Sequence, residues 1–282
     1  MKFPPKPTHN SLKALAGLVL LLLTCACSHV ERDAQVLLSE AREAYAEARY
    51  NDAKNLIDSI RNTYPKAFDT RREANVLKRQ AELGEQHQTL IYLDSLLTAQ
   101  QARLDSIRGD FAFEKDTAYE AIGHYLLPAQ VLERNLHRSY IRFRTDENGV
   151  LSMTSVYCGS YNIHHTSVTV TAPDGTFAST PLAPNCYETT LLGEHIETAE
   201  YPRGRDGDVP GFVRLNADKN LQLTYHGERT FHTTLLPSDR EAAVRVGQLA
   251  ELLAAMADAR ARVEEAKRRI AFFEAKTTDP AE

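Results

Sequence analysis

The chain has 282 residues, of which 43% are hydrophobic and 25% charged, the balance of a folded globular protein. Its formal net charge of −5 argues against a nucleic-acid partner, because such a partner selects a clustered basic surface. Tryptophan is absent, so any stacking on a sugar would have to use tyrosine.

The first 27 residues have the pattern of an export signal. Three lysines and no acid come first, and an apolar run follows from Ala14 to Thr24. That run is too short to span a bilayer as a mature helix. We therefore expect the segment 1–27 to direct export, with residues 1–26 removed afterwards.

The end of this run, Leu-Leu-Thr-Cys-Ala-Cys-Ser, resembles a bacterial lipobox. Cys27 follows the small residue Ala26 and is the expected site of lipidation, whereas Cys25 follows Thr24 and fits less well. The resemblance implies a protein held by its lipid in a membrane of the bacterial envelope, preferably the outer membrane, with its soluble part in the periplasm. The alternative is an ordinary secretory signal cleaved nearby.

After lipidation of Cys27, Cys158 and Cys186 are the remaining cysteines apart from the removed Cys25. An exported protein meets an oxidising compartment, in which disulfides persist. A bond between them would close a loop of about 29 residues and stabilise the fold by roughly 3 to 4 kcal/mol. The sequence leaves open whether they bond or are two separate thiols.

A helical section follows the signal. Residues Ala34 to Pro65 resemble one tetratricopeptide (TPR) repeat, a helix-turn-helix unit of 34 residues. The matching positions are Leu37, Ala41, Tyr50, Ala53, Ile57, Ile60 and Pro65. The alternative is a generic helical hairpin, and either one must stack on a further helix to bury its apolar face.

That further helix is predicted from Asp69 or Thr70 to Ile107, ending at Gly109. It carries an apolar seam at heptad spacing: Val76, Leu83, Leu90, Leu93, Leu97, Leu104 and Ile107. Gly84 interrupts the helical pattern and is expected to loosen or kink the helix.

A second long helix is predicted from Ser238 to about Lys276, with a capping box formed by Ser238 and Glu241. Its seam is Leu249, Leu252, Met256, Ala259, Val263, Ala266, Ile270 and Phe273. We expect the two seams to pair as an antiparallel coiled coil within one chain. Dimerisation through the C-terminal helix is the alternative.

Between Phe111 and Leu236 the hydrophobic period changes to two, which predicts strands. Hairpins are expected over 140–155 and 167–178, a strand over 187–192, and a meander of three short strands over 211–215, 221–225 and 229–235. Seven to nine strands predict an antiparallel sandwich or open barrel, and the sequence does not decide between them.

No residue set specifies a reaction: the chain has no nucleophile elbow, no P-loop and no dinucleotide fingerprint. His164 and His165, with Cys158 and Cys186 at a distance, match no short zinc motif, and neighbouring side chains of a strand point to opposite faces. We expect no catalytic residues, no metal and no cofactor.

Two weaker candidates remain. Asp206-Gly207-Asp208 lacks the acid that a calcium loop needs at its twelfth position, so we interpret Tyr201 to Pro210 as a turn. Five tyrosines could line a ligand or glycan face: Tyr157, Tyr161, Tyr187, Tyr201 and Tyr225.

Together, the lipobox, the segment YPKAFDTRREA and the following LDSLL resemble small TPR-like lipoproteins of Bacteroidetes-type bacteria. The resemblance implies an envelope location and an interaction role, and nothing catalytic. The expected organisation is α+β: a signal (1–27), a TPR-like hairpin (28–66), a first coiled-coil helix (67–109), a β-domain (110–236) and a second coiled-coil helix with a short tail (237–282). The expected function is a membrane-anchored scaffold that binds another envelope protein. The alternative is a β-module that binds a glycan or another small ligand.

Overall fold

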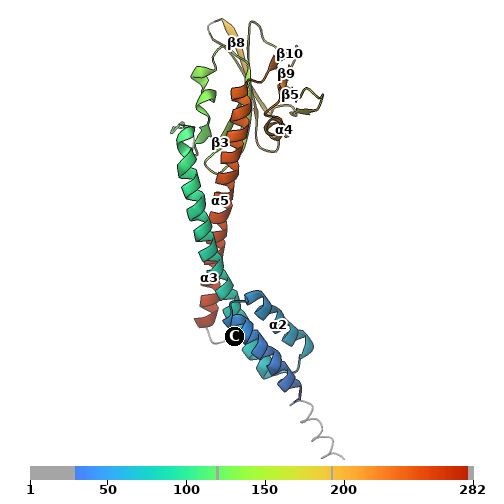
Figure 1. Cartoon of the computed structure of the whole chain (residues 1–282), viewed down its shortest axis with the longest axis vertical. Coiled ribbons are helices and arrows are strands. Elements are labelled where there is room, and N and C mark those ends of the chain that lie inside the picture. The colour runs from blue at the N-terminus through green and yellow to red at the C-terminus, as the bar shows by residue number, and fades with distance from the viewer. Residues whose placement is uncertain (1–28, 119–120, 192, 279–282) are drawn as a thin grey trace, which may run out of the picture. The chain divides into compact units, whose positions relative to one another are not determined.

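A computed structural model of the chain describes residues 29–118, 121–191 and 193–278 (Figure 1). It confirms a mixed α+β protein with helices and two antiparallel sheets. The lipobox and Cys27 lie outside the described residues. None of the described helices is both long enough and apolar enough to cross a membrane.

The chain divides into two compact units. Among the described residues, the helical unit consists of 29–94 and 262–278, and the β unit lies within Ser95–Ala261. These limits differ from the expected ones, because they cut through α3 (Phe68–Ile107) and α5 (Pro237–Thr278), each of which contributes one part to each unit.

In the helical unit, a helix over residues 29–46 packs with α2 (Tyr50–Thr63) and the first part of α3. The buried side chains are mostly small or aliphatic, including Ala34, Leu38, Ala41, Ala44, Ala53, Ile57, Ile60, Ala74, Leu77 and Ala81. Alanines at the contacts let helix backbones approach closely. The expected seam residues Val76, Leu83 and Leu90 are not part of this core, and Val76 is 43% exposed. The reason is that α3 turns the face carrying Ala74, Leu77 and Ala81 toward the hairpin.

The β unit holds ten strands among the described residues, somewhat more than expected. One sheet has the order β1-β2-β3-β4-β8-β7 and the other the order β10-β9-β5-β6. The strands are β1 (Ala112–Glu114), β2 (His124–Leu126), β3 (Tyr140–Asp146), β4 (Leu151–Gly159), β5 (Ser167–Thr171), β6 (Phe177–Ser179), β7 (Asn185–Leu191), β8 (Glu194–Tyr201), β9 (Gln222–His226) and β10 (Phe231–Thr234).

The two expected hairpins, β3–β4 and β5–β6, are confirmed. Both sheets contribute to one apolar core, in which Phe143 and Met153 of the first meet Val168 and Leu223 of the second. Of the two architectures left open, two sheets sharing one core correspond to the sandwich.

One predicted strand is wrong. Residues 211–215 belong to a helix, α4 (Val209–Leu215), whose buried residues are Val209, Pro210 and Val213. Proline in the first turn suits a helix, because its missing N–H would have no partner there and its φ is already helical.

The expected capping box of α5 is also wrong. The helix begins at Pro237, and the carboxylate that reaches back is that of Asp239, which accepts the backbone N–H of Leu236 at 3.3 Å. Asp239 is 1% exposed and also accepts two hydrogen bonds from Arg138, at 2.6 and 2.9 Å. Glu241 makes no such bond and lies exposed beside Arg245.

Within the β unit, one apolar cluster contains side chains of both α3 and α5. Leu97, Leu104 and Ile107 of α3 belong to one cluster with residues of α5. The α5 members are Leu249, Leu252, Leu253 and Met256.

Candidate functional site

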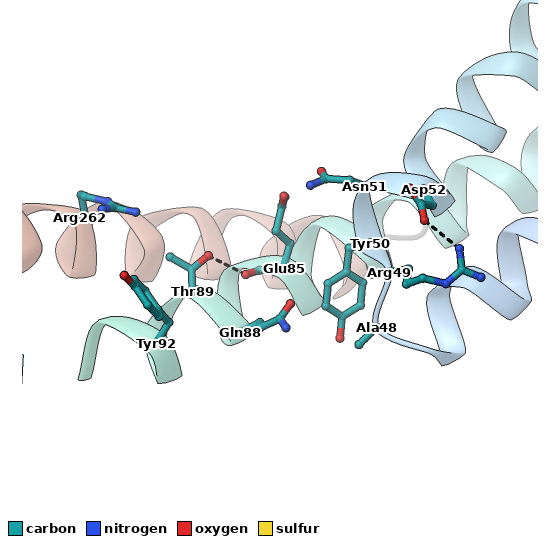
Figure 2. Close-up of a pocket in the computed structure, with 10 residues that line it drawn as sticks. All are labelled: Ala48, Arg49, Tyr50, Asn51, Asp52, Glu85, Gln88, Thr89, Tyr92 and Arg262. Atoms are coloured by element: carbon teal, nitrogen blue, oxygen red, sulfur yellow. Dashed lines mark hydrogen bonds and ion pairs between the residues drawn. The ribbon is translucent and has the colours of Figure 1, made fainter. Parts of the chain in front are cut away.

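A cavity of the helical unit has a volume of about 480 Å³ (Figure 2). Its walls come from the turn before α2, the start of α2, one face of α3 and a side chain of α5. The lining residues are Ala48, Arg49, Tyr50, Asn51, Asp52, Glu85, Gln88, Thr89, Tyr92 and Arg262. The volume falls in the range of about 300 to 1,000 Å³ that ligand sites occupy.

Local backbone chemistry fixes the turn on one side of this cavity. Ala48 has a φ of 58°, in the left-handed region, and its N–H donates to the carbonyl of Tyr45 at 3.0 Å. The N–H of Arg49 donates to the carbonyl of Ala44 at 2.8 Å. These bonds satisfy free carbonyls at the end of the helix over 29–46 and allow α2 to start at Tyr50.

Gly84 of α3 sets the position of the Tyr50 ring. A Cβ added at Gly84 would lie 2.7 Å from two carbons of that ring. The ring therefore occupies the space that a side chain on α3 would need. The sequence suggested a loosened helix at this glycine, whereas α3 is helical from Phe68 to Ile107.

Most charges around the cavity are neutralised within the chain. Arg49 donates to Asp52 at 2.8 Å, and Lys54 donates to Glu85 at 2.8 Å. Arg262 differs, because it has no hydrogen-bond or ion-pair partner among the described residues. Its guanidinium is thus free to bind an anionic group of a ligand.

A smaller cavity, of about 260 Å³, adjoins the first and shares Glu85, Thr89 and Arg262 with it. It continues along α3 and α5 to Arg269, which is paired with Glu265 at 2.6 Å. We call the two cavities together the helical groove. Its aromatic wall is Tyr50 and Tyr92, and Tyr92 is 59% exposed.

The β unit has a second cavity, of about 690 Å³, formed by the loop before α4, the β3–β4 turn and part of α5. Its polar lining residues are Arg203, Asp206, Asp208, Arg214 and Glu251. Arg214 is paired with Glu251 at 2.6 Å, whereas Arg203 has no partner in the part of the chain that the structure describes. We call this the loop cavity.

Glu197 on β8 organises a buried polar network that the sequence did not indicate. One carboxylate oxygen accepts the N–H groups of Ile163 and His164 at 2.6 and 2.9 Å, and the other accepts the N–H and Nδ1 of His165 at 2.8 and 3.0 Å. Burial raises the pKa of this carboxyl, but the hydrogen bonds from His165, His164 and Ile163 outweigh it, so the pKa lies below its usual value.

The network continues from His165 to Ser155, whose hydroxyl lies 2.8 Å from Nε2. Because a carboxylate only accepts, His165 donates from Nδ1 to Glu197 and accepts from Ser155 at Nε2. This is the connectivity of a Ser-His-acid triad. However, all three residues are at most 2% exposed and none lines a cavity described above, so a substrate cannot reach the serine.

His164 is exposed whereas His165 is buried, and both lie in a segment that forms no strand, so the alternation expected of a strand does not apply to them. His164 lies instead near Glu188 and Glu197, with their ligand atoms within 4.8 Å of one another. Both oxygens of Glu197 already accept two hydrogen bonds each, so this group lacks a third available ligand. Asp206 and Asp208 belong to no comparable group in the described residues.

The disulfide that the sequence allowed is not formed, since Cys158 and Cys186 are both free. Cys158 on β4 lies opposite Ile196 of β8, and Cys186 on β7 lies opposite Ala199. The two thiols are therefore separated by β8. Ile196 and Ala199 are three positions apart, so the thiols also point to opposite faces of the sheet.

The predicted tyrosine face does not exist as one surface. Tyr157, Tyr201 and Tyr225 are buried at 1% exposure or less, in the sandwich core. Only Tyr161 and Tyr187 of the five are exposed.

No family model, no curated protein and no solved structure matches the chain. The functional conclusion therefore depends on the residues and the geometry described above.

Proposed function

We propose that the protein is a lipid-anchored, non-enzymatic scaffold of the bacterial envelope, and that the helical groove binds an extended segment of another envelope protein. The location is supported by the lipobox at Cys27. The binding role is supported by the groove, where an aromatic wall lies beside Arg262, a cation that has no partner among the residues that the structure describes.

The chemistry of the groove indicates the kind of segment. Arg262 would bind a carboxylate, either of an acidic side chain or of a chain terminus. Tyr50 and Tyr92 would contact an apolar or aromatic side chain, and Gln88 would bind backbone polar groups. In this proposal the hairpin is TPR-like, because repeats of that kind bind peptides on concave helical surfaces. The two long helices form an antiparallel coiled coil along their seams.

The experiment is site-specific photocrosslinking of the full chain in its native envelope. A photoreactive residue at Tyr92 should capture a partner, and Arg262→Glu should reduce the yield roughly tenfold by repelling the acidic group. Arg268→Glu is the matched control, because it makes the same charge change at an exposed position outside the groove. Capture that is equal in both variants, or as strong from Asn75 as from Tyr92, would contradict the proposal.

A second candidate is supported by the loop cavity: binding of a small polar ligand, such as a glycan, by the β unit. Carboxylates and guanidinium groups that lie beside glycines could bind neighbouring hydroxyl groups of a sugar, and the volume of the cavity is large enough for a small ligand. Binding of oligosaccharides to the full chain, lost in Arg203→Ala and retained in Arg262→Glu, would favour this function over the first. Tyrosine substitutions do not test it, because no tyrosine lines the loop cavity.

A further inference from the structure

Strand β7 is an edge strand without the protection that edges usually have. It ends the six-stranded sheet, and β8 is its one partner among the described strands. All seven of its residues are exposed, and the Glu188 carboxylate accepts hydrogen bonds from Asn162 and His164. The other edge strands, β1, β6 and β10, have only three or four residues.

The sequence of β7 also favours pairing. Natural edge strands avoid association through charged side chains (lysine above all), proline, a bulge or short length. The strand Asn-Cys-Tyr-Glu-Thr-Thr-Leu has seven residues, of which one, Glu188, is charged and none is lysine or proline. Its pairing with β8 is continuous from Asn185 to Leu191. Tyrosine and threonine are good strand formers. A seven-residue edge of this kind is a template for an additional strand.

We propose that β7 pairs antiparallel with β7 of a second copy of this chain, joining two six-stranded sheets edge to edge. The two-fold axis of such a pair is perpendicular to the sheet, so equivalent faces of both copies lie on the same side. Residues that lie directly opposite each other must then have their side chains on the same face of the joined sheet. This is possible only in registers in which one residue of β7 lies opposite the same residue of the second copy.

The side chains select among these registers. Centring on Glu188 places two carboxylates directly opposite each other, which is destabilising. Centring on Thr189 places Tyr187 of each copy opposite Leu191 of the other. It also places Glu188 of each copy opposite Thr190 of the other. Tyr187 and Leu191 are 58% and 46% exposed and share one face, so this register covers both apolar side chains and opposes no like charges.

Disulfide trapping in the full chain tests the proposal. With Cys158→Ser and Cys186→Ser as background, Thr189→Cys should form a covalent dimer under mild oxidation roughly tenfold faster than Phe177→Cys, because pairing raises the effective concentration of the thiols. Phe177 is the matched control, since it is 65% exposed on the short edge strand β6. A mixture of Tyr187→Cys and Leu191→Cys chains should give the mixed dimer.

A measurement that uses no crosslinking guards against trapping of rare encounters. Thr189→Arg places two like charges opposite each other and should shift the sedimentation of the otherwise wild-type chain from dimer to monomer, with the circular dichroism unchanged. Thr189→Cys dimerising no faster than Phe177→Cys would overturn the proposal, as would a wild-type chain that sediments as a monomer. Faster trapping of Glu188→Cys would overturn the register, and capture of a different protein at Thr189→Cys would assign the edge to that partner instead.

Discussion

Glu197 is buried, ionised and bonded to four donors, which makes it the residue on which the segment 163–165 depends. Three of its donors are consecutive backbone N–H groups, so one side chain satisfies a stretch of chain that forms no strand. An unsatisfied buried N–H costs about 1 to 3 kcal/mol, and here several would be lost together.

We therefore expect Glu197→Gln to lower the free energy of unfolding by roughly 3 kcal/mol. The amide nitrogen of glutamine cannot accept hydrogen bonds, so the N–H groups that face it would lose their acceptor. Urea denaturation followed by circular dichroism measures this. Glu188→Gln is the control: Glu188 is exposed and bonds to His164, so its loss should cost less than about 1 kcal/mol. Equal effects of the two variants would mean that Glu197 is not a buried anchor.

His165 and Glu197 give the stability a defined dependence on pH. Burial lowers the pKa of His165, despite the opposing effect of the hydrogen bond that it donates to Glu197. Below about pH 6.5 the unfolded chain binds a proton at His165 that the folded chain does not. The pKa of Glu197 is lowered as well, so both groups make the folded state less stable as the pH falls.

We predict that the free energy of unfolding decreases from pH 7.5 to 5.5, and that His165→Gln flattens this decrease. His164→Gln should steepen it, because the hydrogen bond to Glu188 raises the pKa of His164 and gives it the opposite sign. The experiment is urea denaturation at several pH values. A wild-type slope retained in His165→Gln would assign the pH dependence to other groups.

At the scale of elements, Asp239 joins the start of α5 to the β unit. It accepts the N–H of Leu236 and two hydrogen bonds from Arg138, so it combines a helix cap with a buried ion pair. Asp239→Asn should destabilise the protein by about 3 kcal/mol, because Arg138 would lose its buried counterion.

The matched control for that variant is Glu241→Gln, at the position that the sequence pattern favours as the capping acid. Glu241 is exposed, and its change should stay within about 0.5 kcal/mol. Thermal and chemical unfolding compare the two. A larger loss of stability in Glu241→Gln than in Asp239→Asn would support the capping box that the sequence predicts between Ser238 and Glu241.

The same elements show which parts of the fold a sequence reveals. Long helices are predictable, because the hydrophobic residues keep a helical period over many turns. Accordingly, α3 and α5 begin and end within about two residues of their predicted limits. Strand β8 was missed because its inward residues include Glu197, which breaks the alternation of apolar and polar residues. The sequence predicts a strand where helix α4 forms, because a short apolar run fits the two-residue period of a strand as well as the 3.6-residue period of a helix.

The candidate site was harder to predict than the fold. Its cavity needs Tyr50, Gly84 and Arg262, which lie far apart in the sequence and match no motif. Gly84 gave a signal, as a glycine within a strong helical pattern, but only the fold shows that Tyr50 fills the vacant space. Glu197 gave none, because an acid in a strand is normally exposed.

For the whole molecule, the proposed function requires a lipid on Cys27. Cys27→Ser should abolish incorporation of labelled palmitate and reduce the share of the protein in the membrane fraction, because the acyl chains are the proposed anchor. Cys25→Ser is the control and should keep both the label and the membrane location, since Ala26 and Cys27 are intact. A wild-type protein that is exported but carries no label would show that the segment 1–27 is an ordinary secretory signal. Loss of label in Cys25→Ser alone would move the lipid to Cys25.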